Sequence, residues 1–103
     1  MRYYFCKLLP PRPTFMADIT PAETALMQEH GRYWRGVMSQ GKVVAFGPVA
    51  DPKGAFGVAI VRLQDDTDIT SLTDHDPVIL ANAGFRFEIL AMPQLVHPEF
   101  AAG

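Results

Sequence analysis

Residues 20–41, TPAETALMQEHGRYWRGVMSQG, carry the start and stop signals of one long helix. Thr20 suits the N-cap, Pro21 suits the first helical position, and Glu23 completes a capping box. Gly41 stands where a left-handed residue commonly ends a helix. Within the span, residues recur at spacings of three and four and form one stripe: Leu26, His30, Tyr33, Trp34, Val37 and Met38. The pattern predicts an amphipathic helix that needs a second layer against its stripe.

Four other segments have the composition of strands. The middle two are joined by the turn sequence ADPKG, which predicts a hairpin. The segment between the first strand and the helix contains three prolines and no clear period, so we expect a loop over residues 10–19. The predicted strands are residues 2–9, 42–49, 55–63 and 85–92.

The polar segment before the last strand predicts a short helix that begins between Asp66 and Asp68. Its expected inner face consists of Ile69, Leu72 and His75. Asp76 precedes Pro77, and the residue before a proline is disfavoured in helical geometry, so we expect the chain to turn there. Residues 78–84 can then form a second helical turn.

This order, β-α-β-β-α-β, predicts an α+β fold of the ferredoxin-like type, with one antiparallel sheet and both helices on one face. A chain of 103 residues is expected to form one domain over residues 1–103, with a core of about 2–93 and a C-terminal tail, 94–103, for which the sequence makes no structural prediction.

Charge and cysteine content narrow the function classes. The net charge of −2 gives no electrostatic basis for binding nucleic acid or an anionic membrane. Cys6 is the only cysteine, so no intrachain disulfide is possible and a reducing compartment is favoured. No apolar run approaches the ~18 residues of a membrane span. We therefore expect a cytoplasmic protein.

The hairpin strands are apolar on both faces, through residues 43–46 and 58–61. A sheet with helices on one face normally has a polar second face if that face meets water. A second copy of the chain covering the open face would explain the pattern, which predicts a homodimer; the alternative is a monomer with a few exposed valines.

His30 occupies the middle of the helical stripe, where the pattern calls for an apolar residue. The turn at Asp76 would bring a carboxylate next to this helix, within ~2.6–3.2 Å of the imidazole or one water away. Such a pair can act as a general base on a small-molecule substrate. The competing interpretation is a core histidine whose ring nitrogens are hydrogen-bonded for structural reasons.

Other patterns were considered for the site. Asp74 and His75 adjoin Asp76, but no ligand spacing typical of a metal site is present, so we predict no metal. No glycine-rich phosphate loop and no G-x-S-x-G sequence occur, and we predict no organic cofactor. Tyr33, Trp34 and Phe46 are the candidate walls of an apolar substrate pocket.

The chain resembles the YCII-related family of small dimeric α+β barrel proteins. The resemblance rests on His30 within the first helix and on three segments in order, GKVVAFGPVAD, KGAFGVAIV and DHDPVILANAGFRFEIL, and it covers about residues 2–93. It implies a ferredoxin-like protomer paired through its sheet into a dimeric α/β barrel. It also implies a pocket with a His–Asp pair, which corresponds here to His30 and Asp76. The proline-rich loop and His75 depart from the family pattern.

Two functions follow. The first is a small cofactor-independent enzyme of the lyase or isomerase type, in which His30 and Asp76 transfer a proton on a small cyclic or carbonyl-containing substrate. The second is a non-catalytic dimer that binds a small molecule or another protein, with a structural His30–Asp76 hydrogen bond. A cavity that reaches His30 would favour the enzyme.

Overall fold

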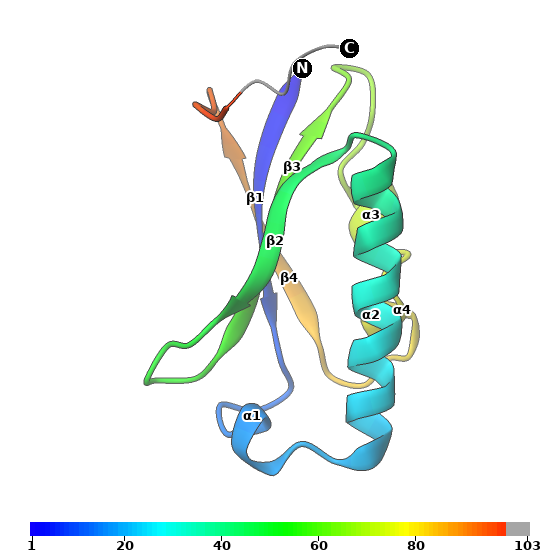
Figure 1. The fold of residues 1–103 in the computed structure, drawn as a ribbon, viewed down its shortest axis with the longest axis vertical. Helices are drawn as coiled ribbons and strands as arrows, with labels where there is room; N and C mark the ends of the chain where they lie inside the picture. The colour runs from blue at the N-terminus through cyan, green and yellow to red at the C-terminus, as the bar shows by residue number, and fades with distance from the viewer. Residues whose placement is uncertain (99–103) are drawn as a thin grey trace.

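The computed structural model describes residues 1–98. It contains one antiparallel sheet whose strands lie in the order β2-β3-β1-β4, so the first and third strands are central. This order and the helices on one side of the sheet give the predicted α+β, ferredoxin-like arrangement (Figure 1). The strands are β1 (Arg2–Leu9), β2 (Val43–Val49), β3 (Phe56–Leu63) and β4 (Arg86–Met92).

Helix α2 (Pro21–Ser39) runs along the sheet and begins as the sequence predicts. The Thr20 hydroxyl accepts a hydrogen bond from the Glu23 backbone N–H at 3.1 Å, and the Glu23 carboxylate accepts from the Thr20 N–H at 2.9 Å. Beyond its end, Gly41 has a positive φ of 78°, as expected. Trp34 and Val37 are buried, whereas Met38, the last residue of the predicted stripe, is exposed.

Two further helices, α3 (Thr70–Thr73) and α4 (Pro77–Leu80), lie on the same side of the sheet as α2 (Figure 1). Helix α3 begins two residues after Asp68, whose carboxylate accepts from the Thr70 N–H at 3.0 Å. The prediction that His75 lies on the inner face is wrong: His75 is exposed, and its Nδ1 lies 2.9 Å from the Ser71 carbonyl oxygen. The buried residues of α3 are Leu72 and Thr73, and the helix ends before position 75.

The prediction of a structureless loop over residues 10–19 is also wrong in part. The segment contains a short helix, α1 (Phe15–Asp18). Phe15 is buried and packs edge-on against Phe85, with ring centroids 5.4 Å apart. Because Thr14 makes no side-chain cap, this tertiary contact explains the helix better than local sequence does.

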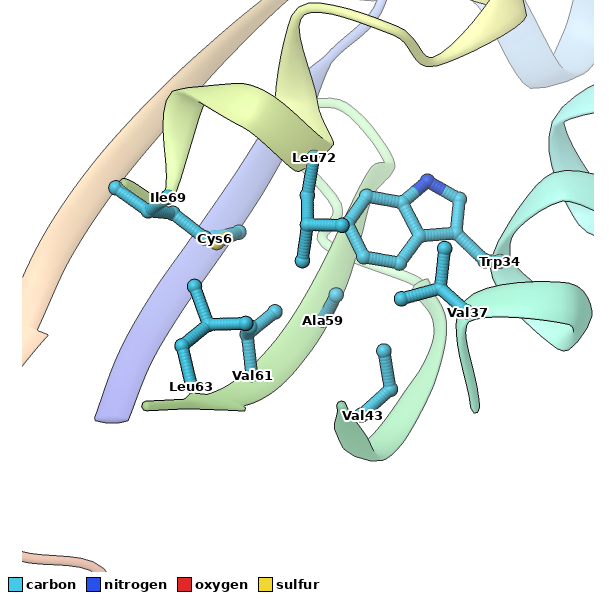
Figure 2. Close-up of a cluster of buried hydrophobic side chains, with 9 residues drawn as sticks. All are labelled: Cys6, Trp34, Val37, Val43, Ala59, Val61, Leu63, Ile69 and Leu72. Atoms are coloured by element: carbon cyan, nitrogen blue, oxygen red, sulfur yellow. The ribbon is translucent and has the colours of Figure 1, made fainter. Parts of the chain in front are cut away.

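The core lies between the sheet and the helices in two clusters. The larger cluster includes Trp34 and joins α2 and α3 to the sheet (Figure 2). The smaller cluster contains Leu8, Phe15, Val78 and Phe85 and lies toward α1 and α4. Three residues of the smaller cluster, Leu8, Phe15 and Phe85, line the cavity described below.

The other face of the sheet is the open face. Since Cys6 and Leu8 belong to the core, strand alternation turns Phe5 away from the helices. Phe5 pairs with Ile60 on β3 and with Leu90 on β4, so these apolar side chains share the open face. No helix among residues 1–98 is long and apolar enough to cross a lipid bilayer.

Candidate active site

Asp76 is fully buried and is the N-cap residue of α4. Its backbone is extended, with φ −60° and ψ 131°, as the following proline favours. Its Oδ1 accepts a hydrogen bond from the Val78 N–H at 3.0 Å. The short helix therefore fixes one carboxylate oxygen and leaves the other available to α2.

The second oxygen of Asp76 receives two side chains from α2. Its Oδ2 lies 2.7 Å from His30 Nδ1 and accepts from Trp34 Nε1 at 2.6 Å. His30 and Trp34 are four residues apart and so lie on one face of the helix, which is why both reach the same oxygen. The predicted hydrogen-bond distance between His30 and Asp76 is confirmed.

These contacts define the histidine tautomer. The indole N–H and the backbone N–H can only donate, so Asp76 accepts on both oxygens, which is the pattern of an ionised carboxylate. A carboxylate has no proton to give, and we therefore assign the hydrogen of this contact to His30 Nδ1. In the neutral form of the ring, His30 Nε2 is then the nitrogen without a hydrogen.

A cavity of about 290 Å³ adjoins this pair. His30 is one of its lining residues, and 16% of the His30 side chain is exposed, whereas Asp76 is sealed. The lining comes from several elements, including Met16 on α1, Trp34 on α2 and Phe46 on β2. A ligand in this space would meet the imidazole of His30 and would not meet the carboxylate behind it.

Two of the three residues predicted to form the pocket walls line the cavity, and the third does not. Trp34 and Phe46 line the cavity, as expected, but Tyr33 is not among the described lining residues. The Tyr33 hydroxyl donates to the Leu72 carbonyl oxygen at 2.5 Å and thereby joins α2 to α3. Its ring packs at 88° to the Trp34 ring, with centroids 5.6 Å apart. Burial, followed by the nearby charge of Asp76, raises the pKa of Tyr33.

The two residues that precede Asp76 in the sequence do not line the cavity. Asp74 and His75 are both exposed, and neither lines the space beside His30. Within residues 1–98, no group of three or more histidine, cysteine, aspartate or glutamate side chains gathers as metal ligands would. The absence of a metal from the working protein stays a prediction.

Sequence reasoning missed two features of the site. Trp34 was expected only as a wall, although its spacing of four from His30 was a visible signal that both could share one partner. Arg12 was given no role. Its guanidinium binds Asp18 at 2.6 Å and Glu23 at 2.7 and 2.8 Å, which joins α1 to the first turn of α2 beside the cavity.

Comparison with known proteins identifies the family. The model of the YCII-related domain matches residues 3–93, so the chain belongs to the family of YCII-related domain proteins. No curated protein matches the chain. A solved structure, that of a formyltetrahydrofolate deformylase from Pseudomonas putida KT2440, aligns with a TM-score of 0.44 and 17% identity over 89% of this chain. The aligned part spans 29% of that deformylase chain.

Proposed function

We propose that the protein is a small cofactor-independent enzyme of the lyase or isomerase type. His30 transfers a proton on a small cyclic or carbonyl-containing substrate bound in the cavity. The observation that carries this proposal is the contact between His30 Nδ1 and Asp76, because it leaves Nε2 without a hydrogen-bond partner among the described residues, on a side chain that lines the cavity. A free imidazole nitrogen beside a ligand space is the arrangement that a general base needs.

Asp76 acts in this proposal through His30. When Nε2 takes a proton, the ring becomes an imidazolium, and the carboxylate 2.7 Å from Nδ1 offsets its charge. Trp34 and Val78 hold both carboxylate oxygens, so the ring keeps its orientation during the transfer. The proton can then return to another atom of the substrate, which gives an isomerisation, or remain until a leaving group departs, which gives an elimination.

The second candidate function is a non-catalytic binding dimer in which the His30–Asp76 contact is structural. The burial of Asp76 favours it, because this carboxylate also caps α4 and would be needed for folding alone. The cavity at His30 favours the enzyme, because a purely structural pair has no need of an adjoining ligand space.

We also propose that the protein is a homodimer that pairs through the open face. Phe5, Ile60 and Leu90 make that face apolar, and Leu90 is 62% exposed. On the same face, Arg62 Nε is buried without a hydrogen-bond partner among the described residues, which a partner chain could supply. Light scattering at micromolar concentration should return about twice the 11.4 kDa chain mass, and the mass of one chain would contradict the dimer.

A general base in an apolar cavity can be tested without knowing the natural substrate. The probe is 5-nitrobenzisoxazole, a neutral bicyclic molecule. A base removes its ring C–H proton, the electron pair completes a nitrile, and the N–O bond breaks to release a phenolate. We expect saturable ring opening, faster than that given by free imidazole at the same concentration.

His30→Gln should remove this activity, because glutamine has no basic nitrogen. Asp76→Asn should lower it, because an amide N–H at this position would direct the ring hydrogen to Nε2. His75→Gln is the matched control, since His75 is exposed and outside the cavity, and it should leave the rate unchanged. A rate that survives in His30→Gln, or one no faster than free imidazole gives, would contradict the proposed catalysis.

A further inference from the structure

The cavity beside His30 has walls of one chemical kind. None of its described lining residues is a lysine, arginine, aspartate or glutamate. The Trp34 N–H is already bonded to Asp76, and burial raises the pKa of the Cys6 thiol to about 12, so that thiol is neutral. His30 is therefore the one lining side chain with a nitrogen free to bind a polar ligand group.

Two cations lie close to lining residues of the cavity. Lys7 Nζ lies 4.4 Å from the ring centroid of Phe56, but Lys7 alternates with the core residues Cys6 and Leu8 and therefore projects toward the open face of the sheet.

The second cation is Arg12. The Arg12 guanidinium lies 5.4 Å from the ring centroid of Phe15, which is a lining residue. It donates four hydrogen bonds, two to the Glu23 carboxylate and two to Asp18, and the carboxylates of Glu23 and Asp18 raise the pKa of Arg12. Arg12 therefore holds α1 in place and supplies no unpaired positive charge.

The His30–Asp76 pair also has no positive net charge to offer. With a neutral ring, the pair carries one negative charge from Asp76, and with a protonated ring its net charge is zero. A carboxylate or phosphate that entered the cavity would lose its hydration without gaining a compensating cation. A neutral ligand avoids this cost.

We propose that the site takes a neutral, mainly apolar molecule of one or two rings, which presents a single polar group or acidic hydrogen to His30 Nε2. This inference rests on the proposed function and gives its substrate class. The size follows from the volume: an apolar cavity of about 150 Å³ holds one benzene ring, and this cavity measures about 290 Å³. Contact with the aromatic walls, such as Phe46 and Trp34, would supply the affinity.

The test is calorimetric titration with two molecules of nearly equal shape, 2-naphthamide and 2-naphthoate, at neutral pH. We expect the neutral amide to bind at least about tenfold more tightly than the anion, because the cavity offers no charge partner. Equal binding, or tighter binding of 2-naphthoate, would overturn the proposal. Absence of binding by both would overturn it as well.

A charge placed at the rim should change this preference. Met16 lines the cavity and is 61% exposed, so Met16→Lys can add a cation without burying it. We expect 2-naphthoate to bind about two- to fivefold more tightly to this variant. Ala17→Lys is the matched control on the same helix, because Ala17 is exposed and is not a lining residue of this cavity. An equal gain in both variants would show binding elsewhere and would overturn the placement.

The titrations test the substrate class, and the benzisoxazole assay tests the catalytic base, so either proposal can be contradicted while the other stands. If 2-naphthoate binds best while His30→Gln still abolishes benzisoxazole opening, the substrate class is wrong and the base is right. If the amide binds best while His30→Gln opens benzisoxazole as fast as the unmodified protein, the cavity is a neutral-ligand site without proton transfer. The second result would leave the substrate class as the ligand class of a binding protein.

Discussion

The two faces of the sheet are both apolar but differ in what lies against them. On the covered face, Leu63 is about 1% exposed, and Trp34 of α2, which belongs to the same core cluster, is also about 1% exposed. On the open face, Leu90 is 62% exposed, and Lys7 spreads over the Phe56 ring, 4.4 Å from its centroid. The comparison shows that apolar residues in a strand do not reveal which face is the core. Helices determine that, and they place the cavity and the His30–Asp76 pair on the same side.

The largest difference in unfolding free energy between the two faces should come from a leucine-to-alanine substitution made once on each face. Leu63→Ala should cost about 2–5 kcal/mol of unfolding free energy, because it leaves a hole in a packed core. Leu90→Ala should cost no more than about 0.5 kcal/mol in the monomer. Urea unfolding at low protein concentration measures both. If the Leu90→Ala cost increases with protein concentration, the open face contributes to an interface between chains.

A carboxylate-to-amide substitution should also affect stability differently on the two sides of the sheet. Asp76→Asn should cost about 2–3 kcal/mol, because its amide nitrogen would confront a buried donor, the Trp34 indole N–H at one position or the Val78 backbone N–H at the other. Glu88→Gln, on the open face, should change stability by less than about 0.5 kcal/mol, since its ion pair with Arg86 is exposed and 4.0 Å long. Thermal unfolding of the two variants under the same conditions tests this difference, and equal losses would contradict it.

A smaller effect is expected from Trp34→Phe, which keeps an aromatic side chain, although a smaller one, and removes the donor to Asp76. We expect a loss of about 1–2 kcal/mol. Nitrogen NMR of the His30 ring should still show hydrogen on Nδ1, because Asp76 keeps its contact with that atom. Tyr33→Phe is the companion variant, since it removes a different hydrogen bond on the same helix and should leave the His30 signals unchanged. A hydrogen on Nε2 in the unmodified protein would contradict the assigned tautomer.

The smallest effect concerns the thiol on the covered face. Burial raises the pKa of Cys6 from 9.0 to about 12, so its folded form disfavours the thiolate. Its contribution to stability is complete below pH 9 and is lost as the pH increases from about 9 toward 12. At pH 8, alkylation of Cys6 should therefore be far slower in folded than in unfolded protein. In a Cys6→Ala background, Leu90→Cys should react readily, and slow reaction at that exposed position would show that something covers it.

The order of the elements could be predicted because their signals are local. The capping box at Thr20 and the proline after Asp76 act through a few bonds, and both appear as expected. Helix α1 could not be predicted in this way, because the burial of Phe15 against Phe85 depends on contact across the fold. The bond from Trp34 to Asp76 was missed because a tryptophan in an apolar stripe indicates packing, and its N–H becomes important only when a buried acceptor is near.

The hydrogen bonds of Asp76 restrict which residues can replace it as the sequence diverges. One side chain begins α4, anchors Trp34 and orients His30, so a replacement must satisfy all three neighbours at once. Serine has one side-chain oxygen and is too short to accept from both α4 and α2. Glutamate is one carbon too long to cap its own helix. Asparagine would place an N–H group where a carboxylate oxygen now accepts a hydrogen bond. The cavity walls face no such restriction, since one apolar residue can substitute for another there. Descendants of this chain would therefore change ligands by altering Met16, Phe46 or Phe87 long before position 76 could vary.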